Sequence, residues 1–179
     1  MSHITKEFAL QLLEKNETPN HVIQHCMAVA NASRLLATEL NKYGFDLSIE
    51  VIEGAAMIHD IARIHDEHEI LGAKIAEAHG FHQEAHIIRE HMHYAITTEI
   101  EHITEMDIVC LGDRMIKEDQ YVGLKRRMDY ILEKWQGNPK AEEIIRARVL
   151  EQTRLLLEIE KMIGIGIDEL IDEKGHKND

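Results

Sequence analysis

Residues 55–60 read Ala-Ala-Met-Ile-His-Asp, an apolar stretch followed directly by two side chains that bind metal ions. The stretch lies in a predicted helix that Ser48 can cap and that runs to about Ile64. Burying a histidine and a carboxylate beside an apolar stretch costs free energy unless each has a partner. No lysine or arginine precedes Asp60 in this helix, so we expect a metal cation to be that partner.

Helical periodicity extends from this segment in both directions. Upstream, residues 4–15 predict one amphipathic helix, and a second begins at Thr18-Pro19 and ends at Tyr43-Gly44. The Thr18 hydroxyl is expected to cap that second helix, with Pro19 at its first position. Further helices are predicted over residues 68–80, 82–93, 104–118 and 121–135. Strand signals are nearly absent, so we predict an all-α fold, a compact orthogonal helical bundle.

The clearest break in the chain is Gly137-Asn138-Pro139. Beyond it, apolar residues recur at helical spacing from Ile144 to Ile163 and predict one long amphipathic helix. We therefore expect a metal-binding helical domain over residues 1–136 and a C-terminal helical extension over residues 137–179. The extension either packs on the domain or forms a homodimer, and the sequence favours neither.

The composition is that of a globular chain, with 44% apolar and 30% charged residues among 179. A formal net charge of -13 argues against binding to nucleic acids or anionic membranes, but bound metal ions would still allow a phosphorylated substrate. No apolar stretch reaches the roughly 18 residues of a membrane span, and no secretory leader is recognisable. We expect a cytoplasmic protein, with Cys26 and Cys110 as buried, reduced thiols.

Two further histidines face inward on predicted helices. His25 follows Val22 by three residues and precedes Val29 by four, which places it on the buried stripe of its helix. His91 follows Ile88 by three residues and is placed in the same way. Each could be a core histidine with a hydrogen-bond partner, or a metal ligand.

Asp113 and His68 complete the set of candidates. Asp113 lies among apolar neighbours such as Val109, an unlikely setting for a solvated acid. Its alternative is an ion pair with Arg114 or Lys117. His68 begins a segment in which Gly72 would let another backbone or a ligand come close.

Several segments, in this order, resemble the HD-domain superfamily of metal-dependent phosphohydrolases. They are His25-Cys-Met-Ala-Val29-Ala30, Met57-Ile58-His59-Asp60-Ile61-Ala62-Arg63, His68-Glu-Ile-Leu-Gly72-Ala73, Ile88-Arg89-Glu90-His91 and Leu111-Gly112-Asp113-Arg114. The resemblance covers roughly residues 18–130 and is greatest to small stand-alone prokaryotic HD proteins of the dinuclear branch. Met92 follows His91, so the doubled histidine of the cyclic-di-GMP phosphodiesterase branch is absent.

The resemblance implies a site with two divalent transition-metal ions, chosen from Fe, Mn, Co, Ni and Zn. The metal ligands that it implies are His25, His59, Asp60, His68, His91 and Asp113, with Asp60 bridging the two ions. We expect Asp60 to be catalytic and Arg63 to contact the phosphate, assisted by Arg114 or Lys117. The alternative for each of these three cations is a surface salt bridge.

The implied activity is hydrolysis of a phosphomonoester, phosphodiester or anhydride bond by metal-activated water. The substrate would be a nucleotide or another small phosphorylated metabolite. Two alternatives stay open: a diiron oxygenase with the same ligands, which needs iron and oxygen, and a non-catalytic module that senses a nucleotide. Retention of all six ligands argues against the sensor.

Overall fold

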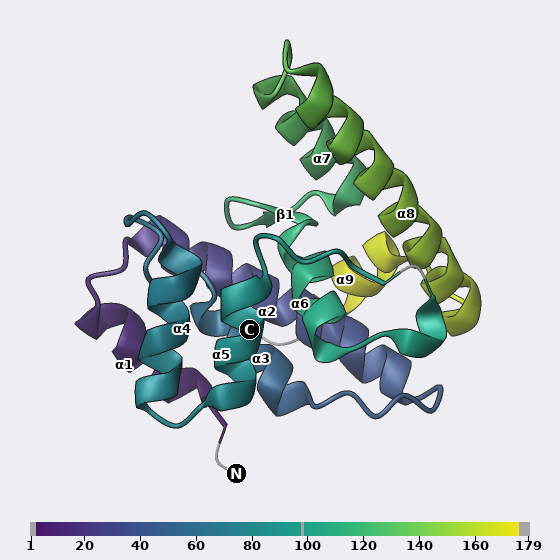
Figure 1. Cartoon of the computed structure of the whole chain (residues 1–179). Coiled ribbons are helices and arrows are strands. Elements are labelled where there is room, and N and C mark those ends of the chain that lie inside the picture. Colours follow the sequence, from purple (N-terminus) through teal and green to yellow (C-terminus); the bar gives the residue numbers. More distant parts are fainter. Residues whose placement is uncertain (1–2, 98, 176–179) are drawn as a thin grey trace.

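Nearly every element in the computed structural model of the chain is a helix (Figure 1). The structure describes residues 3–97 and 99–175. Its helices are α1 (Lys6–Lys15), α2 (Asn20–Asn41), α3 (Ile49–Ile58), α4 (His68–Ala78), α5 (His82–Glu90), the 3₁₀ helix η1 (Ile100–His102), α6 (Glu105–Asp113), α7 (Gly123–Lys134), α8 (Pro139–Ile163) and α9 (Ile167–Gly175). The strands β1 (Ile116–Lys117) and β2 (Gln120–Tyr121) form a small antiparallel hairpin. The predicted all-α fold is confirmed.

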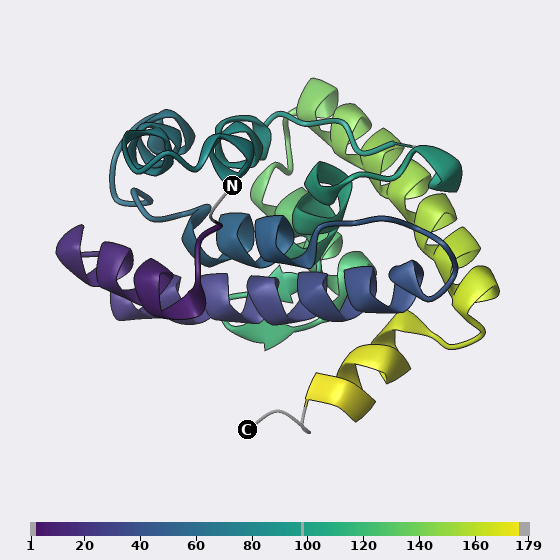
Figure 2. The ribbon, with the colours of Figure 1, turned by 90° about the horizontal axis from the view of Figure 1, so that it is seen from below.

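Helix α3 is the centre of the core. It packs against α1, α2, α5 and α6, and nearly every residue from Val51 to Ile58 is buried. Figure 2 shows α3 beside the longer α2, whose buried residues recur at intervals of three and four. Gly54 lets the N-terminal segment come close, since a Cβ there would lie 3.0 Å from the Cβ of Ile4. Because α3 is buried on most of its surface, it holds the residues that follow it in a fixed position.

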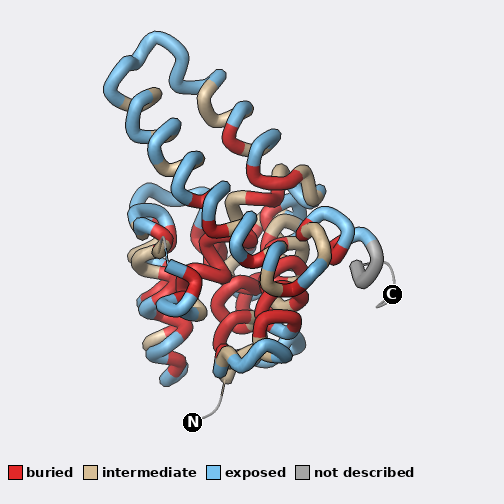
Figure 3. Tube along the Cα trace, turned by 90° about the vertical axis from the view of Figure 1, so that its right-hand side faces the viewer, coloured by how far each residue is buried: buried red, intermediate tan, exposed pale blue. Residues whose placement is uncertain are grey.

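Helices α7 and α8 pair into a hairpin that projects from the bundle (Figures 1 and 3). The buried residues of α8 all lie toward its C-terminal end, where it approaches α2. Trp135 and Ile144 are exposed near the tip of the hairpin. The division of the chain at residue 136 and the homodimer both stay predictions. No helix among the described residues, α8 included, is long and apolar enough to cross a membrane.

The predicted end of α3 at about Ile64 is wrong, because the helix stops at Ile58. Residues 59–65 form successive tight turns, in which the amide of Ile61 donates to the carbonyl of Ile58 and that of Arg63 to Asp60. The Thr18 hydroxyl donates to the carbonyl of Ile61 at 2.8 Å. It therefore does not cap α2, and Pro19 is the N-cap residue. This contact between distant segments satisfies a carbonyl that would have a helical partner if α3 continued.

The predicted helix over residues 104–118 is also too long. Helix α6 ends at Asp113, and the chain then turns into the β1–β2 hairpin, which the sequence pattern does not predict. Glu118 forms the turn of this hairpin with a left-handed backbone, φ 58°. Helix α5 likewise ends at Glu90, so His91 follows the helix and does not lie inside it. Helix α9 was not predicted.

Gly112 is expected to tolerate no larger residue. A Cβ at this position would overlap Ser33 Oγ of α2 and lie 3.3 Å from the carbonyl oxygen of Val29. Ser33 is fully buried, so it has little room to move. We expect Gly112→Ala to lower the free energy of unfolding by about 1–3 kcal/mol, measured by urea denaturation. Gly166→Ala is the control, because its Cβ would meet only a side-chain oxygen at 3.8 Å. Equal stability of the two variants would contradict the prediction.

Both cysteines are expected to be unreactive in the folded protein. Cys26 and Cys110 are buried free thiols, 0% and 2% exposed. Burial raises the pKa of Cys110 to about 12 and that of Cys26 further. The reactive thiolate is therefore scarce at pH 8. A disulfide-exchange reagent should modify neither thiol in the native state and both after denaturation. Rapid modification of the native protein would contradict this.

Candidate metal centre

The residues expected to bind metal meet at one place in the bundle, at the ends of several helices. His25 comes from α2, His59 and Asp60 directly follow α3, and His68 is the first residue of α4. His91 directly follows α5, and Asp113 ends α6. The four imidazoles form a continuous row in the order His25, His59, His91, His68, with ring centroids 5.2–5.7 Å apart.

Asp60 belongs to two groups of side chains that could each hold a metal ion. One group is His25, His59 and Asp60, and the other is Asp60, His68 and His91. Within each group the ligand atoms lie within 4.8 Å of one another. Asp113 adjoins the first group, with its Oδ1 3.1 Å from His25 Nε2 and 3.9 Å from His59 Nε2. The arrangement suits a carboxylate shared between two ions.

Backbone carbonyls orient three of the imidazoles. His59 Nδ1 lies 2.8 Å from the carbonyl of Ala56, and His91 Nδ1 lies 2.7 Å from that of Ile88. Both carbonyls belong to the last turns of helices, where carbonyls lack a helical partner. His25 Nδ1 lies 2.7 Å from the carbonyl of Glu118 in the hairpin turn. These contacts hold a proton on Nδ1 of each ring, so that Nε2 of each ring faces the carboxylates.

Unpaired acceptors show that the centre fits a cation. Among the described residues, His59 Nε2 and Asp60 Oδ1 are buried without a hydrogen-bond partner. Arg63 donates to His68 Nε2 at 3.0 Å, so this nitrogen carries no proton for Asp60 Oδ1, 3.1 Å away. Buried acceptors without donors are costly. A divalent metal ion with imidazole and carboxylate ligands would satisfy them together.

The electrostatics of the centre also favour a cation. Burial alone would raise the pKa of Asp60, but the imidazoles around it, His59 first, hold it far below its usual range. Burial also opposes ionisation of Asp113, yet the hydrogen bond from His25 lowers its pKa to about 2. Burial lowers the pKa of His59. At neutral pH the centre therefore contains two carboxylates and a neutral His59.

Burial and the two carboxylates shift the pKa values of His25 and His91 in opposite directions. Burial alone would lower the pKa of His25, but its contact with Asp113 raises it. His91 behaves in the same way through Asp60. A metal ion would have to displace any proton from Nε2 of these rings, because it binds only an unprotonated nitrogen.

Gly72 lets α4 approach the turns that carry the ligands. A Cβ at Gly72 would lie 3.1 Å from Ile88 Cγ2, 3.2 Å from Ile61 Cγ2 and 3.8 Å from the carbonyl oxygen of His59. Gly72 thus permits the close approach of two isoleucine side chains, whereas the sequence led us to expect another backbone or a ligand. The small residue brings His68, on the same helix, within reach of Asp60.

A cleft of about 570 Å³ opens onto the centre, lined by His25 and Asp60 among others. Arg63 lies in this cleft, with its Nε 3.6 Å from Asp60 Oδ2 and its side chain 46% exposed. The two other cations expected to assist lie elsewhere. Arg114 donates to the carbonyl of Tyr94 at 2.8 Å, and the Lys117 ammonium lies 4.2 Å from the ring centroid of Tyr130. Neither lines the cleft, so that expectation is corrected.

Arg127 lines the same cleft and was not predicted. Its Nε is buried and has no hydrogen-bond partner among the described residues. The sequence offers no signal for it, because Arg127 directly follows Arg126, which is exposed and outside the cleft. Only the packing of α7 distinguishes the two.

Comparison with known proteins finds a matching family and a partly similar relative. The family model of the HD domain matches residues 22–152. An uncharacterized protein of Methanocaldococcus jannaschii is 33% identical over 97 residues, which are 52% of this chain and 57% of the relative. The match thus spans little more than half of that relative's length. No solved structure matches the chain.

Proposed function

This chain belongs to the HD domain family, and we propose that it is a metal-dependent phosphohydrolase. Proteins of this family bind divalent metal ions and are in general hydrolases. The proposed reaction cleaves a phosphomonoester, phosphodiester or anhydride bond of a nucleotide or another small phosphorylated metabolite. One observation carries the proposal: Asp60 is shared by two ligand groups and lines an open cleft.

In this proposal the two ions share Asp60. The first ion would also be held by His25, His59 and Asp113, and the second by His68 and His91. When bound, such ions lower the pKa of water and neutralise charge on phosphoryl oxygens. The backbone carbonyls that hold the Nδ1 protons of His25, His59 and His91 keep Nε2 of these three rings directed into the centre.

Arg63 and Arg127 are the proposed phosphate contacts in the cleft. A guanidinium pairs with phosphate oxygens through two parallel hydrogen bonds. Arg63 already reaches Asp60 and His68, so it can bind a phosphoryl group beside the centre. Arg127 has a buried donor without a partner, which an anionic substrate would satisfy. In a chain of net charge -13, these two residues supply positive charge where the substrate must bind.

The test is phosphate release from a panel of nucleotides and phosphate esters by protein loaded with Mn²⁺ or Fe²⁺. We expect release that is lost with a chelator and restored by the metal. An oxygen electrode should record no oxygen consumption in the same samples. Absence of release with every metal would overturn the proposal, and oxygen uptake with an organic substrate would point to the oxygenase.

A further inference from the structure

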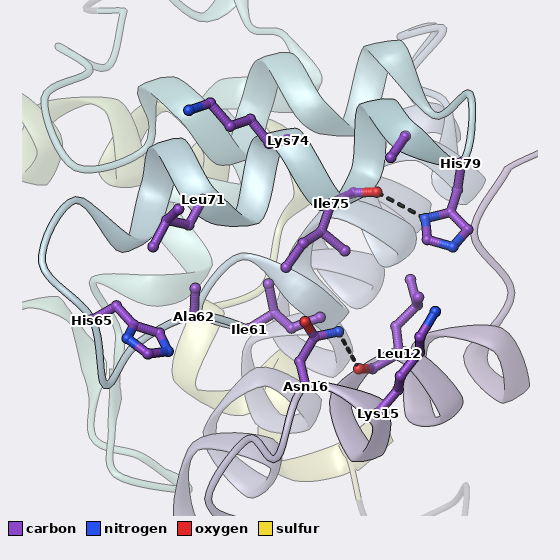
Figure 4. A pocket seen from close by; sticks show the side chains of 11 residues that line it. Leu12, Lys15, Asn16, Ile61, Ala62, His65, Leu71, Lys74, Ile75 and His79 are labelled. Carbon is purple, nitrogen blue, oxygen red and sulfur yellow. Dashed lines mark hydrogen bonds between the residues drawn. The ribbon is translucent and has the colours of Figure 1, made fainter.

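A groove lies on the other side of the turns that carry Asp60. Its volume is about 430 Å³, and α1 and α4 form its two walls (Figure 4). Ile61 and Ala62 lie between these walls, one and two residues after Asp60. The volume lies within the range of small-molecule sites.

The middle of the groove is apolar. Leu12 and Ile61 are 2% and 1% exposed, and they form a fixed floor. Leu71 and Ile75 of α4 extend the apolar surface toward solvent, and Leu71 is 37% exposed. A ligand with an apolar body would remove this surface from water.

The edges of the groove are basic. Lys15, Lys74, His65 and His79 line it, and no aspartate or glutamate does. Figure 4 shows His65 and His79 at opposite ends. Neither lysine has a carboxylate within ion-pair distance in the described part of the chain. This absence of acids is unusual for a chain with 33 Asp+Glu against 20 Lys+Arg.

We propose that this groove is an effector site for an amphipathic organic anion, one carboxylate on an apolar chain. The apolar body would pack on Leu12, Ile61 and Leu71, and the carboxylate would pair with Lys15 or Lys74. A free anion in solution is the expected occupant, because a chain of net charge -13 is repelled from anionic membranes.

The same short segment serves both sites. Asp60 and Arg63 line the metal cleft, while Ile61, Ala62 and His65 line the groove. The segment is built of turns, and it ends at Glu67 with a left-handed backbone, φ 53°. A ligand packed on Ile61 and Ala62 therefore contacts the backbone that positions Asp60. Effector and metal should change each other's affinity by the same factor. This coupling rests on the proposed function; binding to the groove does not.

Binding is tested with decanoate on the metal-free protein by isothermal titration calorimetry. We expect one decanoate per chain, with 1-decanol at least about tenfold weaker because it lacks the charge. Lys15→Gln/Lys74→Gln should weaken decanoate binding by about tenfold. Lys140→Gln/Lys161→Gln, two exposed lysines of α8, is the charge-matched control and should leave it unchanged. Leu71→Glu, at an exposed position, should abolish binding.

The proposed site would be overturned if 1-decanol bound as tightly as decanoate. It would also be overturned if the two double lysine variants had the same affinity for decanoate. Co-sedimentation with phosphatidylglycerol vesicles would overturn the choice of a free anion. The coupling is tested by titrating Mn²⁺ with and without saturating decanoate, where at least a twofold shift in Kd is expected. An unchanged Mn²⁺ affinity would refute the effector role. Failure of Mn²⁺ to bind at all would refute the metal centre, while decanoate binding would still stand.

Discussion

Replacing Asp60 with asparagine is expected to lower phosphate release by roughly 1,000-fold while the helical fold persists. Asparagine keeps the size of the side chain but removes the charge that both ligand groups share. Loss of this one charge should therefore weaken the binding of both metal ions. The measurements are phosphate release, bound metal and the circular dichroism spectrum of the same samples.

Asp46→Asn is the matched control, because Asp46 is exposed and lies outside both ligand groups. It should retain the activity and metal content of the wild type. Full activity in Asp60→Asn would contradict the role of the shared carboxylate. A collapsed helical spectrum would assign Asp60 to folding instead.

Arg127→Gln is expected to raise KM for the substrate by about 10- to 100-fold, with a smaller change in kcat. The Arg127 guanidinium lines the cleft and has a buried Nε without a partner. Its contribution should therefore lie in holding the phosphate. Steady-state kinetics with a phosphate ester that the protein hydrolyses would measure the change.

Arg126→Gln removes the same charge from the neighbouring residue, which is exposed and outside the cleft. Its KM should match that of the wild type. Equal effects of the two variants would mean that Arg127 acts only through net charge. A lower melting temperature in Arg127→Gln alone would show that it supports packing.

Local patterns predicted the class of fold and the candidate ligands. Apolar residues at helical spacing predicted most helices, because one face of each helix packs in the core. The ligands stood out as polar residues in apolar surroundings, and the structure brings all of them together. Their assignment to particular ions stays a proposal.

The helix ends that shape the centre could not be predicted, because contacts distant in sequence determine them. Helix α3 stops at Ile58. Just beyond this end, the Thr18 hydroxyl donates a hydrogen bond to the carbonyl of Ile61, 43 positions away in the sequence. The carbonyl of Glu118 orients His25 from 93 positions away. Arg127 lies on the side of α7 that lines the cleft, whereas the neighbouring Arg126 does not line it. Each of these depends on the packed structure and leaves no periodic signal.

The number of metal ions per chain tests the shared carboxylate most directly. Protein loaded with Mn²⁺ and desalted would be analysed for metal, beside Asp60→Asn treated identically. About two ions per chain are expected in the wild type, and less than about one in the variant. One ion or none in the wild type, or equal metal content in the two proteins, would contradict a centre built around Asp60.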